Sequence, residues 1–329
     1  MVYRADRHRR TAVKDQVLTG AELVARQVYW RSPLVVELYG KFKQSRRHAP
    51  SGPYATVQEL EGRLQELLPA GNGLVLVHSS SDGILLAKHA QADALLNPLN
   101  SALAVLGSLI RLVGSQGTLV MPTHPAYDGD PGFMHDKSHL TFTYDPQKTP
   151  SRTGLLSEVF RRRSGTRRSL HPLSSLAVAG PLGDDLLKDN LNREKPLPHG
   201  AYSSYYRFCR HGGLVISLGV SLIKSMTLLH CAEEVRDQEW PIKGFAYERT
   251  FHVVGTGEEP WIVRERRPQF VRYLALGKVR RDLLKEGILH ESVFKGIRLD
   301  WARGSDVLEF MMARNARGYP YYPLPFMRR

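Results

Sequence analysis

Cysteine is scarce in this sequence, and so are the apolar segments that mark exported or membrane-embedded proteins. Cys209 and Cys231 are the only cysteines among 329 residues, which is too few for a disulfide framework, and they lack C-x-x-C spacing. No apolar run approaches the roughly 20 residues needed to cross a bilayer, and the N-terminus shows no signal-peptide core. We therefore expect a cytoplasmic protein and exclude the membrane, secreted and collagen-like classes.

Common motifs for nucleotides, hydrolysis and zinc are also missing. There is no G-x-G-x-x-G after a strand pattern, no G-x-x-x-x-G-K-[ST] and no G-x-S-x-G. The 13 histidines never form H-E-x-x-H or a Cys/His cluster at zinc spacing, so we expect no metal. No RNA-recognition or zinc-finger signature is present, so a nucleic-acid function would rest on basic charge alone.

Basic side chains are in excess, and they are concentrated near the N-terminus. The formal net charge is +14 at pH 7, and residues 1–48 hold 11 Lys or Arg against four Asp or Glu. This segment is either a surface for phosphate, nucleic acid or an anionic membrane face, or a solvated arm. Its apolar spacing is helical, and a Pro/Gly/Ser stretch follows at 48–54. The sequence therefore predicts a basic helical N-terminal extension over 1–54 and a second domain over 55–329.

The second domain alternates helix and strand patterns. Thr56 and Glu59 have capping-box spacing at the start of an amphipathic helix. Short apolar runs at 73–80 and 116–125 enclose a helical pattern at 93–114. This strand–helix–strand order predicts a parallel βαβ unit and an α/β fold.

A long loop separates this unit from further elements. Residues 124–150 are rich in His, Asp, Gly and Pro, and they predict a structureless loop, which is usually functional or disordered. Ser305 is the expected N-cap of the last helix. The other expected elements are strands at 174–180 and 212–219, a hairpin at 246–255 and 260–267, and helices at 153–165, 227–236, 270–287 and 305–316.

Polar residues follow three of the predicted strands, at the position where α/β folds place ligands. Ser79, Ser80 and Ser81 end the first strand; their hydroxyl and backbone N–H groups suit phosphate, and they equally suit a simple turn. Thr123 ends the second strand. His171 precedes a proline, which holds its backbone extended, so its ring either faces a cleft or is a satisfied core side chain.

Four segments carry a resemblance to a known family. They are LVLVHSS, QGTLVMPTH, YDPQKTPSRTGLLSEVFRRRSGTRRSLHPLSSLAVAG and SLGVSLIKSMTLLHCAEE. In order and in most spacings they resemble the aminoglycoside 3-N-acetyltransferase, or antibiotic N-acetyltransferase, family over about residues 60–275. The resemblance implies a three-layer αβα fold with a central mixed sheet. It also implies an acyltransferase that moves an acetyl group directly from acetyl-CoA to an amine, without a metal.

The same resemblance implies roles for individual residues. His171 is the expected general base for the amine, and Glu233 is expected to orient its ring and to stabilise the imidazolium. The developing oxyanion is expected to meet backbone N–H groups near the first strand end or the Ser175 hydroxyl. The candidate contacts are Ser79, Ser80, Ser81, Thr123 and Ser175 for acetyl-CoA, and Asp128, Asp130 and Glu158 for the acceptor.

Alternatives to these roles remain open, and two positions depart from the family pattern. Glu233 is also placed to pair with Arg236 on a helix surface, and Cys231 is more typical of a small buried side chain than of a nucleophile. The acidic loop residues equally suit solvated turns. Gly83 stands alone where the family has a glycine-containing phosphate loop, and Lys224 stands where the family often has a small or amide residue.

Two classes of function therefore remain. One is an acetyl-CoA-dependent N-acetyltransferase whose acceptor is an amino sugar or a related natural-product amine, in antibiotic resistance or biosynthesis. The other is a nucleic-acid or anionic-surface binding protein on a catalytically decayed fold. Because the chain is strongly basic, we expect the acceptor to have few amines and to carry a carboxylate, phosphate or nucleotide.

Overall fold

The structure is a computed structural model, which describes residues 15–25, 28, 32, 54–69, 73–88, 95–131, 135–194, 196–267, 270 and 273–322. Within the expected extension, residues 15–25 are helical. The rest of the expected helical hairpin and the boundary near residue 54 lie almost wholly outside the described residues. None of the helices in the described ranges is long and apolar enough to cross a membrane.

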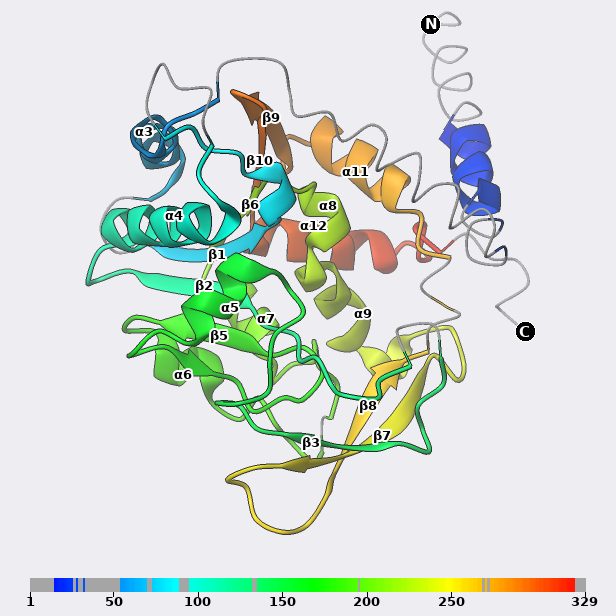
Figure 1. Ribbon diagram of the computed structural model, residues 1–329. Coiled ribbons are helices and arrows are strands. Elements are labelled where there is room, and N and C mark those ends of the chain that lie inside the picture. Colours follow the sequence, from blue (N-terminus) through cyan, green and yellow to red (C-terminus); the bar gives the residue numbers. More distant parts are fainter. Residues whose placement is uncertain are drawn as a thin grey trace, which may run out of the picture.

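A seven-stranded mixed sheet forms the centre of the molecule (Figure 1), in the order β4-β5-β2-β1-β6-β10-β9. Its strands are β1 (Leu74–Ser79), β2 (Thr118–Pro122), β4 (Arg167–Arg168), β5 (Leu176–Ala179), β6 (Leu214–Leu218), β9 (His290–Phe294) and β10 (Ile297–Arg303). Strand β1 pairs in parallel with both β2 and β6, and the other pairings are antiparallel. The carboxyl ends of the three parallel strands therefore meet at one edge of the sheet.

Helices cover both faces of this sheet, because its central strands are apolar on both sides. In β1, Leu74 and Leu76 pack into one core, and Val75 and Val77 pack into the other. The second core is covered by α3 (Val57–Leu67), α4 (Pro98–Val113) and α5 (Leu155–Arg161). The first core is covered by α6 (Gly183–Leu187), α7 (Ser204–Arg210), α8 (Leu222–Ser225), α9 (Cys231–Glu234), α11 (Leu276–Lys285) and α12 (Gly304–Asn315). The expected three-layer αβα fold is thus confirmed, as is the βαβ unit β1–α4–β2.

A second, three-stranded sheet lies beside the central one, at the bottom of Figure 1. It consists of β3 (Thr141–Tyr144), β7 (Ala246–Val253) and β8 (Trp261–Arg266), of which β7 and β8 form the expected hairpin. The expectation of a structureless 124–150 segment is wrong at β3, because β3 pairs in parallel with β7. This non-local pairing leaves no short-range signal in the sequence.

One predicted helix start is confirmed by the structure, and two others differ from the sequence prediction. The capping box is present, with the Thr56 hydroxyl accepting from the Glu59 backbone and the Glu59 carboxylate accepting from the Thr56 backbone. Ser305 is not the N-cap of α12, because β10 runs directly into the helix at Gly304, whose N–H donates to the Gly213 carbonyl (2.8 Å). Helix α11 begins at Leu276, six residues later than expected.

The described residues include three 3-10 turns. Turn η1 (Ser81–Gly83) follows β1, η2 (Thr227–His230) lies between α8 and α9, and η3 (Asp237–Glu239) follows α9. The loop after β1 approaches the loop after β6 closely: a Cβ on Gly83 would lie 2.0 Å from the Gly219 carbonyl oxygen. This contact requires glycine at position 83.

Candidate active site

A cavity of about 260 Å³ opens at the edge where the parallel strands end. Its walls come from the segments after β2 and β6, from the segment before β5, from α8 and α9, and from β8. The polar and charged side chains that line it are His124, Arg152, Ser174, His199, Lys224, Ser225, Thr227, His230, Glu234, Glu265 and Arg266. A hollow thus lies at the expected edge of the sheet, but none of the ten residues expected in the site is among those that line it.

Two histidine–carboxylate pairs stand side by side at this cavity. His230 Nδ1 lies 3.1 Å from Glu233 Oε2, and His199 Nδ1 lies 3.0 Å from Glu234 Oε1. The two ring centroids are 5.5 Å apart. Both carboxylates come from the single turn of α9 and are buried. A glutamate doublet in a buried helix thus orients two imidazoles.

Arg266, from β8, joins the two pairs. Its Nη2 atom lies 3.1 Å from Glu233 Oε2 and 3.5 Å from Glu234 Oε1, and its Nη1 atom lies 3.2 Å from His230 Nε2. The Tyr322 hydroxyl donates to the other oxygen of Glu233 (2.7 Å). Two carboxylates share one guanidinium, so this buried cluster carries a net negative charge.

The charges of this cluster set the protonation of the His230 ring. Burial alone would raise the pKa of Glu233, but Arg266 and His230 lower it to about 2. Burial also opposes ionisation of Glu234, whose pKa is nevertheless lowered by His199 and Arg266. Burial and Arg266 lower the pKa of His230, against the opposite effect of Glu233. At neutral pH the carboxylates are therefore charged and His230 is neutral. Its proton lies on Nδ1, facing Glu233, and Nε2 is an acceptor.

His171 lies close to this cluster, because the charges of His199 and Glu234 both affect its pKa. It is buried in the β4–β5 connection and is not among the residues that line the cavity. Its backbone N–H donates to the Asn190 side chain (3.1 Å) and its Nδ1 accepts from the Leu173 backbone (3.3 Å). Burial lowers the pKa of His171 to about 4. No hydrogen bond joins His171 and Glu233, both of which the structure describes; Glu233 is paired with His230 instead, and a catalytic role for His171 stays a prediction.

The residues expected to contact acetyl-CoA fall into two groups. Ser79, Ser80 and Ser81 are partly exposed at the end of β1, and the Ser79 hydroxyl has no hydrogen-bond partner among the described residues. Thr123 and Ser175 are fully buried, and the Ser175 hydroxyl donates to the Thr123 carbonyl (2.6 Å). The Ser79 hydroxyl oxygen is itself buried, whereas Ser80 and Ser81 are partly exposed, and Thr123 and Ser175 lie in the interior.

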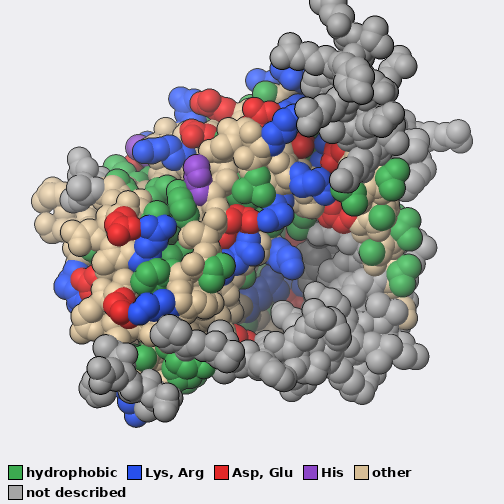
Figure 2. Space-filling model, turned by 90° about the horizontal axis from the view of Figure 1, so that it is seen from above, with side chains coloured by type: hydrophobic (Ala, Val, Ile, Leu, Met, Phe, Trp, Pro, Cys, Tyr) green, Lys and Arg blue, Asp and Glu red, His purple; other side chains and the backbone are tan. Residues whose placement is uncertain are grey.

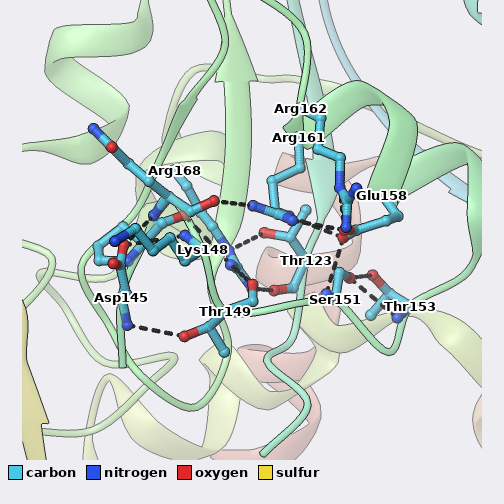
Figure 3. Close-up of polar contacts among 12 residues, drawn as sticks. Thr123, Asp145, Lys148, Thr149, Ser151, Thr153, Glu158, Arg161, Arg162 and Arg168 are labelled. Carbon is cyan, nitrogen blue, oxygen red and sulfur yellow. Dashed lines mark hydrogen bonds and ion pairs between the residues drawn. The ribbon is translucent and has the colours of Figure 1, made fainter. Parts of the chain in front are cut away.

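A buried arginine links Thr123 and Ser175 to the neighbouring loop (Figure 3). Arg168 Nε lies 3.1 Å from Thr123 Oγ1 and 3.0 Å from Ser175 Oγ, and its Nη1 donates to the Thr149 carbonyl (2.5 Å). These contacts fix the Asp145–Ser151 segment against the ends of β2 and β5. Thr123 and Ser175 therefore act as ligands of a structural guanidinium.

The acidic residues expected to bind the acceptor are not among the residues that line this cavity. Glu158 binds Arg161 (2.6 Å), Arg162 (2.7 Å) and the Ser151 backbone N–H (2.9 Å), as Figure 3 shows. Asp130 binds Lys137 (2.7 Å), and Asp128 is exposed. Glu158 thus anchors a loop, and acceptor contacts by these three residues stay predictions.

Sequence reasoning missed His199, His230 and Arg266 as site residues. His199 follows Pro198 in a loop with no helical or strand pattern, and only the tertiary fold brings it to Glu234. Arg266 ends an ordinary alternating strand, and its burial results from packing of β8 on α9. The one available signal was the doublet Glu233–Glu234 inside an apolar helix, because two buried carboxylates require partners.

Known proteins resemble this chain in sequence. A family model described as aminoglycoside 3-N-acetyltransferase matches residues 88–315. The chain is 31% identical over 165 residues to aminoglycoside N(3)-acetyltransferase IX of Micromonospora chalcea, covering 47% of this chain and 57% of the relative. It is 33% identical over 190 residues to aminoglycoside N(3)-acetyltransferase VII of Streptomyces paromomycinus, covering 55% and 63%. The chain thus spans about three fifths of the length of these relatives.

Solved structures show the same fold. Aminoglycoside acetyltransferase AAC(3)-IVa, as the apoenzyme, superposes with a TM-score of 0.62 at 22% identity, covering 84% of this chain and 94% of that one. AAC-IIIb, in a binary complex with CoASH, gives a TM-score of 0.62 at 21% identity, covering 80% and 97%. The three-layer arrangement with a central mixed sheet is shared with these proteins.

Proposed function

This chain belongs to the aminoglycoside 3-N-acetyltransferase family, and from that membership we propose that it transfers an acetyl group from acetyl-CoA to an amine. The observation that carries the proposal is His230 at the cavity wall, with its Nδ1 held by the ionised Glu233. This is the arrangement of a general base with a fixed tautomer. The motif T-x-x-H-x-A-E, which supplied part of the resemblance, contains both residues.

We assign the general base to His230 rather than to His171, for geometric reasons. A base must reach the proton that it removes, and His230 lines the cavity while His171 does not. The Nε2 atom of His230 carries the unprotonated lone pair, and among the described residues it accepts from Arg266. An amine that enters the cavity has to take the place of that Arg266 contact.

The chain's own residues then account for movement of the proton. The amine proton passes to His230 Nε2 as the amine nitrogen attacks the thioester carbonyl of acetyl-CoA and forms the C–N bond. The C–S bond then breaks, and the departing CoA thiolate takes the proton from the His230 imidazolium. The imidazolium is stabilised by Glu233, whose low pKa keeps it ionised throughout. Such a base contributes about 10²–10⁴ in rate.

The second pair, His199 with Glu234, serves to position the acceptor in this proposal. The His199 side chain is 6% exposed, against 22% for His230, so it is less accessible as a base. His199 lines the same cavity, and its buried Nε2 atom has no hydrogen-bond partner among the described residues. A hydroxyl or amine of the acceptor would satisfy that buried atom.

The residues at the end of β1 fit the phosphate-bearing acyl donor. The partly exposed Ser80 and Ser81 follow β1, at the strand edge where the cavity also opens. Hydroxyl and backbone N–H groups at such an edge suit phosphate. We therefore assign these serines, and not Thr123 or Ser175, to contact with CoA.

An amine screen with acetyl-CoA, read by mass spectrometry, tests this function. We expect at least one amino sugar or related amine to gain an acetyl group. In parallel, CoA alone should raise the melting temperature, since a ligand at 100 times its Kd stabilises by about 2.7 kcal/mol. Absence of both effects would contradict the proposal and favour a binding protein on a decayed fold.

A further inference from the structure

The charged side chains around the cavity differ in sign between its buried end and its exposed walls. The buried end holds Glu233 and Glu234 with Arg266 between them, a cluster of net negative charge. On one wall, Glu265 is neutralised by the fully buried Arg249, at 2.7 Å. The remaining charges on the wall are basic and exposed.

These remaining charges are Arg152 and Lys224, and both lack a counter-charge. Arg152 lies in the loop before α5, where its backbone N–H donates to the His124 carbonyl (2.9 Å). Lys224 lies on α8, immediately after β6. Both are exposed and both line the cavity, and neither side chain has an ion pair or hydrogen bond with any described residue. Two unpartnered cations at the mouth of a cavity favour an anionic ligand.

Figure 2 shows a hollow in the upper face of the molecule with several Lys and Arg side chains on its wall. A polycation that entered would meet these positive groups before it met the buried carboxylates. An acceptor with one ammonium and one anion would match both ends of the cavity.

We propose that the acceptor is an amine that also carries an anionic group such as phosphate or carboxylate. The amine lies toward His230 and Glu234, and the anion is bound by Arg152 and Lys224. This inference rests on the proposed acetyl transfer and names its substrate class. In this inference Lys224 is a specificity-determining residue. It stands where the family often has a small or amide residue.

The phosphates of CoA offer the same chemistry as an anionic acceptor, so the experiment separates the two sources. The double variant Arg152→Ala/Lys224→Ala is compared with the wild type by calorimetric titration of CoA, glucosamine 6-phosphate and glucosamine. The two sugars differ only in the phosphate. The matched control is Arg210→Ala/Lys285→Ala, which removes the same charge from exposed positions outside the cavity lining.

We expect the wild type and the control to bind glucosamine 6-phosphate at least about tenfold more tightly than glucosamine, a preference that added salt weakens. The double variant should lose this preference and keep its affinity for CoA. Lys224→Glu should reverse the preference toward glucosamine and the polycation kanamycin. Equal binding of the two sugars by the wild type, or a loss of CoA affinity in place of sugar affinity, would overturn the inference.

Acetyl transfer is measured separately with the same amines. If the phosphate preference is present but none of these amines is acetylated, the result counts against the proposed function and leaves the anion preference standing. If glucosamine or kanamycin is acetylated better than glucosamine 6-phosphate, the function stands and the anionic acceptor is wrong.

Discussion

At the scale of single residues, the spacing of His230 and Glu233 determines the chemistry of the site. The three-residue offset at the start of α9 brings Glu233 Oε2 to His230 Nδ1 (3.1 Å) and leaves Nε2 toward the cavity. Glu234, the next residue, reaches His199 instead. Two neighbouring carboxylates on one turn therefore serve two different imidazoles.

Glu233→Gln tests whether this pair acts as a unit. The amide retains the shape of the side chain but withdraws the charge that stabilises the imidazolium, so we expect kcat to fall by about 10²-fold or more. The double variant with His230→Ala should be little worse than His230→Ala alone. Steady-state kinetics of the wild type, the two single variants and the double variant measure these losses in kcat. Fully additive losses would show that the two residues act independently.

The pH dependence of kcat follows from the lowered pKa of His230. A base must be unprotonated, and burial and Arg266 hold its pKa below the ordinary 6.5. We therefore expect kcat to be constant around neutral pH and to fall only at more acidic pH. Because Glu233 raises the pKa of His230, Glu233→Gln should move this acidic limb to still lower pH; a move to higher pH would contradict the assignment.

Arg266→Met should destabilise the fold in a pH-dependent manner. It leaves two buried carboxylates without their cation, and breaking a buried ion pair costs about 3–5 kcal/mol. The wild-type pKa of Glu233, about 2, lies below its unfolded value, so its stabilising contribution is present at neutral pH and is lost in acid.

Urea unfolding measures this difference. We expect the deficit of Arg266→Met to be largest at neutral pH and to shrink as the carboxylates protonate. The control is Arg264→Met on the same strand, which removes a more exposed arginine bound to Asp237 (3.2 Å) and should cost about 1 kcal/mol or less. Equal deficits for the two variants, or no pH dependence, would show that the cluster is not stabilised as described.

At the scale of elements, local signals predicted the fold better than the site. Thr56 and Glu59 form the expected capping box, and β1–α4–β2 forms the expected parallel unit, because each depends on nearby residues. The pairing of β3 with β7 and the meeting of Arg266 with α9 depend on packing between distant segments. The motif search named Glu233 and His171 and did not consider His230, which lines the cavity.

The loops after β1 and β6 provide an element-scale prediction. A Cβ on Gly83 would lie 2.0 Å from the Gly219 carbonyl oxygen, so Gly83→Ala must move backbone. We expect a loss of about 1–3 kcal/mol in the free energy of unfolding, together with weaker CoA binding at the adjacent serines.

Gly62→Ala in α3 is the matched control, because its Cβ would meet nothing within 4 Å. Alanine is the better helix former by roughly 1 kcal/mol, so this variant should be as stable as the wild type or more so. Unfolding curves for the two variants check both expectations. A Gly83→Ala protein with unchanged stability would show that the two loops are not in close contact.

At the scale of the whole molecule, a basic chain surrounds a buried cluster that is locally negative. The net charge of +14 predicted an anionic ligand but not where it binds. The structure separates the buried carboxylates from Arg152 and Lys224 at the cavity mouth. Ion pairs also bind the helix at 15–25 to α11: Asp15 binds Lys278 (2.7 Å) and Arg281 (2.7 Å). Leu276, the first residue of α11, lines the cavity.

The central claim is that acetyl transfer occurs at His230. The direct measurement is kcat, with acetyl-CoA and the best amine of the screen, for His230→Ala, His171→Ala and the exposed control His252→Ala. We predict that His230→Ala loses about 10²–10⁴-fold in kcat with CoA affinity unchanged, and that His252→Ala matches the wild type. His171→Ala should lose far less than His230→Ala. A near wild-type kcat for His230→Ala, with the large loss at His171→Ala, would contradict the account.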